Sequence, residues 1–104
     1  MRRVRVLEQA AEEAIEAAAW YEQARAELGV EFARAVDAAI DLLAEEIVPL
    51  TTMPGAAGTR GARKLRLKRF PYDIVVIEHR EEILVVAVAH HSRRPGYWRG
   101  RGSV

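Results

Sequence analysis

The sequence predicts a single α+β domain over residues 1–104, and three observations support this. Helix-like segments occupy the N-terminal half, and apolar strand-like runs occupy the C-terminal half. The length of 104 residues fits one domain. The composition changes near residue 50, but neither half alone could bury a core, so both are expected to fold together. The expected order is strand, helix, helix and three strands (β-α-α-β-β-β).

The N-terminal half is predicted to form a short strand and a helix hairpin. Charged and apolar residues alternate over 3–7, as in a strand with one buried face. A helix is expected over 8–28, ended by Gly29, because glycine tolerates the left-handed conformation that often follows a helix. A second helix over 30–48 has apolar residues at i, i+3, i+4 and i+7 and is closed by Pro49. The one-residue break between the helices favours an antiparallel hairpin.

The first helix should bury one apolar stripe. Its expected members are Ala11, Ala14, Ile15, Ala18, Tyr21 and Leu28. Adjacent helical residues diverge by about 100°. One of Trp20 and Tyr21 should therefore pack inward while the other lies near the rim.

The C-terminal half is predicted to contain a loop and three antiparallel strands. Proline and glycine exclude regular structure over 50–62. Strands are expected over 63–69, 70–78 and 83–89. The last two are apolar at both parities, which indicates central strands buried on both faces. The polar segment 79–82 is expected to join them as a hairpin.

Composition limits the function classes. The sequence has no cysteine, which excludes disulfides and thiolate metal sites. No apolar run approaches the about 18–20 residues of a membrane span, and the N-terminus lacks the apolar segment of a signal peptide. We therefore expect a soluble cytoplasmic protein with no membrane partner.

Charge is unevenly distributed along the chain. Residues 1–62 hold 6 Lys and Arg against 11 Asp and Glu, whereas residues 63–104 hold 10 against 4. The net charges of −5 and +6 favour a face that binds an anionic partner. A plainer alternative is that helix surfaces are often Glu-rich and that strand edges are often protected by Lys and Arg.

The histidines do not indicate a metal site. His90 and His91 are adjacent at the end of a strand, so they should point to opposite faces and cannot share a metal. His79 lies at the other end of that strand, and no carboxylates have ligand spacing. No metal and no cofactor are expected.

A basic and aromatic surface is the strongest functional candidate. Its expected target-binding residues are the cationic strand positions Lys64, Arg66 and Lys68 and the tail residues Arg93, Arg94, Tyr97 and Trp98. For metal-free RNA cleavage, His91 could supply the base, Arg93 or Arg94 the cation and Tyr97 the acid, and Tyr97 or Trp98 could stack a base. Two alternatives are a protein-binding patch and a tail that folds back, with Tyr97 and Trp98 covering the sheet edge.

Three segments resemble the RelE/ParE superfamily of toxins over most of residues 4–101. They are Ala18–Gln23 with Leu28–Phe32, which resemble its helix hairpin, Arg69–Val75, which resembles its central strand, and Val88–Trp98, which resembles its last strand and tail. The resemblance implies a small twisted, mainly antiparallel sheet with the N-terminal helix hairpin packed on one face. It also implies the toxin of a type II toxin–antitoxin system, neutralised by a cognate antitoxin and contacting operator DNA only through that antitoxin.

The superfamily divides by target. RelE-like members cleave mRNA on the ribosome, whereas ParE-like members inhibit DNA gyrase and block replication. RelE-type nucleases carry an arginine just after the central-strand tyrosine, and here Asp73 follows Tyr72. A carboxylate would repel a scissile phosphate, so the resemblance favours a ParE-like gyrase inhibitor that is not an enzyme. The alternatives are a ribosome-dependent mRNA endonuclease using His91, Arg94 and Tyr97, or a degenerate, non-toxic member.

Overall fold

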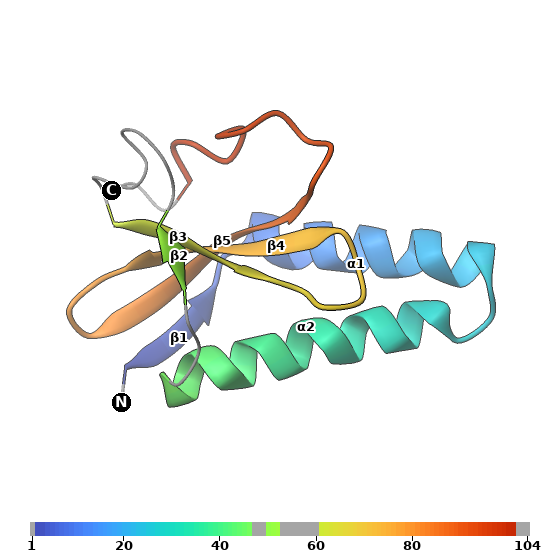
Figure 1. The fold of residues 1–104 in the computed structure, drawn as a ribbon, viewed down its shortest axis with the longest axis horizontal. Coiled ribbons are helices and arrows are strands. Elements are labelled where there is room, and N and C mark those ends of the chain that lie inside the picture. The colour runs from blue at the N-terminus through green and yellow to red at the C-terminus, as the bar shows by residue number, and fades with distance from the viewer. Residues whose placement is uncertain (1, 47–49, 53–60, 102–104) are drawn as a thin grey trace.

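A computed structural model of the protein describes residues 2–46, 50–52 and 61–101. Its two layers are a helix hairpin and a five-stranded sheet (Figure 1). The elements are β1 (Arg3–Val6), α1 (Glu8–Ala24), α2 (Leu28–Glu45), β2 (Thr51–Thr52), β3 (Ala62–Arg66), β4 (Tyr72–Glu78) and β5 (Glu82–His90). The predicted α+β class, helix hairpin and order of the elements are confirmed, with β2 as an addition.

The sheet is mixed, with strand order β1-β5-β4-β3-β2. Strands β4 and β5 form the predicted central hairpin, paired antiparallel from Tyr72↔His90 to Glu78↔Ile83. The N-terminal strand β1 pairs parallel with the first part of β5. Strand β2 lies in the segment expected to be loop and pairs antiparallel with β3 at Lys64 and Arg63. That expectation was wrong for Thr51 and Thr52, because pairing with a neighbouring strand decides strand formation at a sheet edge.

The sheet is buried on both faces, but different segments cover each face. On the helix side the core includes Phe32, Leu43, Ile74, Val76, Ile83 and Val85. On the opposite side it consists of Ala62, Val75, Ile77, Leu84, Val86, Ala87 and Trp98. Strands β4 and β5 contribute side chains to both clusters, which explains why they are apolar at odd and at even positions. The C-terminal segment, through Trp98, covers the face that the helices leave open.

The turn between the helices differs from the prediction. Helix α1 ends at Ala24, and Glu27 adopts the left-handed conformation (φ 71°) that was expected of Gly29. Gly29 instead lies buried in the first turn of α2. A Cβ atom at this position would lie 2.3 Å from the carbonyl oxygen of Ala18 in α1. Gly29 therefore permits the close approach of the two helices rather than ending the first.

Most of the stripe predicted for the first helix is confirmed, since Ala14, Ala18, Tyr21 and Leu28 pack against the core. Ile15 is 68 % exposed, whereas Ala10 and Ala17 are buried. The prediction was wrong for Ile15 alone, because the buried side of α1 is centred on Ala10 and Ala17. Tyr21 packs inward, with its ring 5.3 Å from Phe32, while Trp20 is 65 % exposed. The expected division between these two aromatic residues is confirmed.

Several predicted boundaries need correction. Helix α2 ends at Glu45, and Glu46 is left-handed (φ 57°), so this helix stops before the predicted 48; Pro49 lies outside the described residues. Residues 67–71 form a turn between β3 and β4 rather than continuing the strands, closed by a hydrogen bond from Leu67 N to the Tyr72 carbonyl (3.0 Å). Leu67 and Phe70 are buried on the helix side. The turn therefore carries apolar residues, and its sequence resembles that of a strand. None of the described helices is both long and apolar enough to cross a membrane.

Candidate functional site

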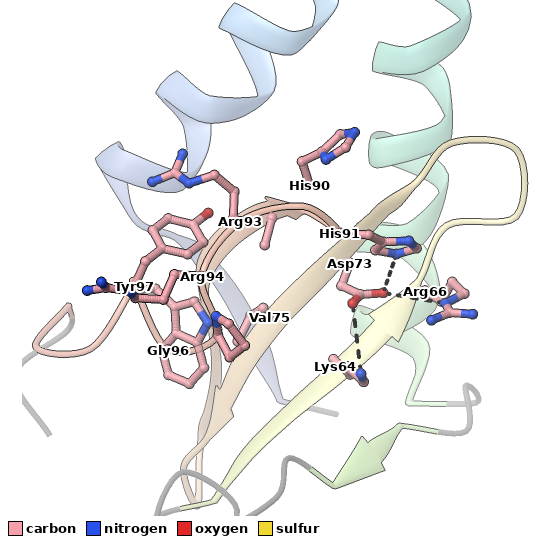
Figure 2. A pocket seen from close by; sticks show the side chains of 13 residues that line it. Lys64, Arg66, Asp73, Val75, His90, His91, Arg93, Arg94, Gly96 and Tyr97 are labelled. Carbon is pink, nitrogen blue, oxygen red and sulfur yellow. Dashed lines mark hydrogen bonds and ion pairs between the residues drawn. The ribbon is translucent and has the colours of Figure 1, made fainter.

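The predicted basic and aromatic residues line a groove on the face of the sheet opposite the helices (Figure 2). Its volume is about 230 Å³. The lining residues are Lys64, Arg66, Asp73, Val75, Ala89, His90, His91, Arg93, Arg94, Pro95, Gly96, Tyr97 and Trp98. Strands β3 and β4 supply its floor, and the end of β5 with the following turns supplies its wall. We call this feature the basic groove.

Asp73 lies between His91 and two cations of the basic groove, Lys64 and Arg66. Its carboxylate is 3.2 Å from His91 Nε2, 3.8 Å from Arg66 Nε and 3.9 Å from Lys64 Nζ. The side chain is only 14 % exposed. Neighbouring strands explain the grouping, since Asp73 is in register with Arg66 on β3 and cross-strand neighbours on one face lie close together. The charge of this acid offsets the cations that would otherwise attract a phosphate.

The predicted row of three cations is only partly assembled. Lys64 and Arg66 both line the basic groove. Lys68 does not, because β3 ends at Arg66 and Lys68 lies exposed in the following turn. The alternation of side chains that would have placed it beside the other two stops with the strand.

The two adjacent histidines face opposite sides of the sheet, as expected. The His90 ring lies edge-on to Tyr72, with centroids 5.0 Å apart, and its Nδ1 is 2.7 Å from Ser92 Oγ. His91 turns to Asp73 on the groove side. Among the residues that the structure describes, no three His, Asp or Glu side chains gather as a metal site would require.

Trp98, one of the expected target-binding residues, is buried. The indole is 6 % exposed and belongs to the cluster beneath the groove. The tail thus folds back onto the face of the sheet. Trp98 belongs to the wall of the groove and, being buried, presents no free ring for stacking. Neither α1 nor α2 contributes to the cluster on this face, which leaves apolar strand residues for the tail to cover.

Tyr97 is held by a contact that the sequence did not predict. Its hydroxyl donates a hydrogen bond of 2.7 Å to Glu13 Oε2 in α1, and the Arg93 guanidinium lies 3.9 Å from the centre of its ring. Burial, and then the bond to Glu13, raise the pKa of Tyr97 well above its ordinary value. In Figure 2 the Tyr97 ring and His91 lie at opposite ends of the groove. The three residues proposed for RNA cleavage are therefore lined up along one groove without converging on one point.

Sequence reasoning missed Glu13 and Arg101. A usable signal existed: Glu13 is three residues after Ala10 and four before Ala17, so it sits on the buried side of α1. An acidic residue on a buried stripe requires a partner. Its partners, however, lie more than 70 residues away in the sequence, and no local pattern indicates them.

Removing the charge of Asp73 should strengthen anion binding by the groove. A pair of unit charges about 4 Å apart interacts with about 1 kcal/mol in water. We therefore expect Asp73→Asn to bind a short single-stranded oligonucleotide about fivefold more tightly at low salt. Fluorescence anisotropy would measure this. Asp37→Asn makes the same charge change at an exposed position of α2; equal gains in both variants would contradict a local effect.

The protein is thus a small α+β domain with a helix hairpin on one face of a mixed sheet and a basic groove on the other. A family model described as "ParE toxin of type II toxin-antitoxin system, parDE" matches residues 4–95. The chain therefore belongs to the ParE toxin family.

A solved structure described as "Chromosomal ParDE TA system from P. aeruginosa" shares this fold. It is 15 % identical, with a TM-score of 0.73 over 86 % of this chain and 96 % of that chain. None of the curated proteins matches the sequence significantly.

Proposed function

We propose that this protein is a gyrase-inhibiting toxin that acts by binding rather than by cleaving RNA. Membership of the ParE family supports the toxin role. The observation that carries the choice of mechanism is the ion-paired Asp73 in the middle of the basic groove. A metal-independent phosphodiesterase relies on cations that stabilise the charge developing in the transition state, and here Asp73 offsets the charge of Lys64 and Arg66.

The state of Tyr97 also supports binding over cleavage. A general acid works best with a pKa near the operating pH, whereas the pKa of Tyr97 is raised by burial and by Glu13. Its proton is directed to Glu13 rather than into the groove. On this proposal, Arg93, Arg94 and the exposed part of Tyr97 contact the target.

The proposed partner is a cognate antitoxin that neutralises the toxin in the cytoplasm. The similar solved structure is described as a ParDE toxin–antitoxin system, and the excess of cations in residues 63–104 suits an anionic partner segment. Contact with operator DNA would occur only through the antitoxin.

The test is a supercoiling assay with purified gyrase and toxin. We expect inhibition by the wild type and at least about tenfold weaker inhibition by Arg94→Ala, because arginines are frequent anchors of protein interfaces. Arg80→Ala provides a matched control, since Arg80 is exposed in the turn between β4 and β5. If saturating toxin leaves supercoiling intact, gyrase is not the target.

A ribosome-dependent endonuclease is the second candidate, because His91, Arg94 and Tyr97 do line one groove with Lys64 and Arg66. It predicts cuts in translated mRNA, mapped by primer extension, that disappear in Tyr97→Phe. Intact transcripts in arrested cells would exclude it. Continued growth after induction without an antitoxin would instead identify a non-toxic member.

A further inference from the structure

We propose that Glu13 of α1 is a positioning residue that fixes the C-terminal segment 93–101 and thereby the wall of the basic groove. The expected effect on gyrase binding rests on the proposed function. The positioning of the tail by Glu13 does not depend on it. Glu13 does not itself line the groove, but it accepts a hydrogen bond from Tyr97, which does. The contacts of Glu13 join α1, β5 and the tail.

The first step concerns the edge of β5. Strand β1 pairs with β5 from Arg3↔Glu82 to Val6↔Val85, and α1 begins two residues later. The rest of β5, from Val86 onward, thus lies beside a helix rather than a strand on that side. Backbone groups on a strand edge need other partners when they are shielded from water.

Two side chains supply those partners. Glu13 Oε1 accepts a hydrogen bond of 3.0 Å from Val88 N, and Arg101 Nη1 donates one of 3.1 Å to the Val86 carbonyl. Glu13 and Arg101 also form an ion pair of 2.9 Å. Both are largely buried, with side chains 16 % and 20 % exposed. Together they bind backbone groups of β5 that a neighbouring strand would otherwise bind.

The same carboxylate also holds the tail. Its second oxygen accepts the Tyr97 hydroxyl at 2.7 Å. The guanidinium groups of Arg93 and Arg101 lie 3.9 Å and 5.1 Å from the centre of the Tyr97 ring. Three donors from β5 and from two points of the tail thus converge on Glu13. We call Glu13, Tyr97 and Arg101 the tail clamp.

The clamp has a direct consequence for the groove. Arg93 packs on a ring whose hydroxyl is fixed by Glu13, and Arg94 to Trp98 form the groove wall. Segments held in their binding geometry before contact lose less conformational entropy on binding. Releasing the tail should therefore weaken target binding even when every contacting residue is retained.

Glu13→Gln tests this directly. The amide keeps the shape but presents a donor where the carboxylate accepts, and it leaves Arg101 without its counter-ion. Hydrogen exchange should be read at Tyr97, Arg99 and Arg101, whose amides donate to carbonyls within the tail. We expect these amides to exchange roughly tenfold to a hundredfold faster, as for the loss of a charged buried hydrogen bond, with the amides that pair β4 and β5 changed by less than about twofold.

Controls separate positioning from general destabilisation. Glu12→Gln makes the same change one residue earlier at an exposed position and should leave exchange unchanged. Tyr97→Phe deletes one donor but retains the Glu13–Arg101 pair, so it remains usable if Glu13→Gln does not fold; it should speed exchange in the tail alone. Unchanged tail exchange in Glu13→Gln, or equal acceleration in the tail and in β4 and β5, would overturn the inference.

Gyrase inhibition is measured on the same samples. We expect Glu13→Gln to inhibit at least about tenfold less well than wild type while the β4–β5 core stays protected. If wild-type toxin does not inhibit gyrase, the proposed function fails, but the exchange result still decides whether Glu13 positions the tail. If the tail opens and inhibition is unaffected, the link between the clamp and the groove is refuted.

Discussion

Replacing Trp98 with alanine is expected to lower the free energy of unfolding by about 3–5 kcal/mol. Its indole is almost fully buried against the helix-free face of the sheet, beside Val75 and Ile77. Truncation would expose part of that apolar face or leave a cavity under the tail. This cost is large because a domain of this size has a stability of only about 5–15 kcal/mol.

Trp20 provides the matched control, because it is the second tryptophan of the chain and is mostly exposed. Trp20→Ala should change the free energy of unfolding by less than about 0.5 kcal/mol. Urea unfolding followed by circular dichroism would measure both variants without depending on tryptophan signals. Each variant retains a single tryptophan. The emission of buried Trp98, which remains in Trp20→Ala, should be blue-shifted relative to that of exposed Trp20, which remains in Trp98→Ala. Equal losses of stability would contradict the packing described above.

The Trp98 result bears on how tail deletions are interpreted. A truncation that removes Trp98 removes part of the core as well as part of the groove. Loss of activity in such a variant would therefore not locate the target-binding residues. Substitutions at exposed Arg93 and Arg94 are better suited to that purpose.

The second large effect is expected at Gly29. Helix propensity alone predicts that Gly29→Ala stabilises the protein by about 1 kcal/mol. The added Cβ would instead lie 2.3 Å from the Ala18 carbonyl oxygen, a backbone atom that cannot move without displacing α1. Overpacking of this kind costs about 1–3 kcal/mol, occasionally more. We therefore expect net destabilisation, and a larger loss for Gly29→Val.

The sign of the change makes this prediction sharp. Chemical unfolding of Gly29→Ala should give a lower midpoint than wild type, whereas pure propensity gives a higher one. Ala38→Gly, at an exposed position of the same helix, calibrates the propensity term and should cost about 1 kcal/mol. A stabilised Gly29→Ala would show that the helices can separate at little cost.

Much of the fold could be predicted because its signals are local. The central strands are apolar at both parities, and α2 carries a regular apolar spacing, so both were predicted. The errors lie where packing between elements decides. Glycine is typical of a helix end, but Gly29 lies where the two helices approach each other closely. Ile15 is apolar, but its side chain remains exposed.

The candidate site was predicted in part for the same reason. Strand alternation placed Lys64 and Arg66 on one face, but it could not show that the strand stops before Lys68. The tail has no periodicity, so nothing local distinguishes exposed Arg94 from buried Trp98. The burial of Trp98 depends on an uncovered sheet face, which is a property of the assembled fold.

The sequence by itself determined the α+β class, the polarised charge, the resemblance to a toxin superfamily and the residue types of the basic groove. Only the tertiary structure decided which of these residues are free to act. It pairs Asp73 with cations from β3 and with His91, buries Trp98, and ties Tyr97 and Arg101 to Glu13. The physical reason is separation along the chain. Contacts between residues 84 and 88 positions apart leave no periodic signal, and form only when the helix, sheet and tail are packed together.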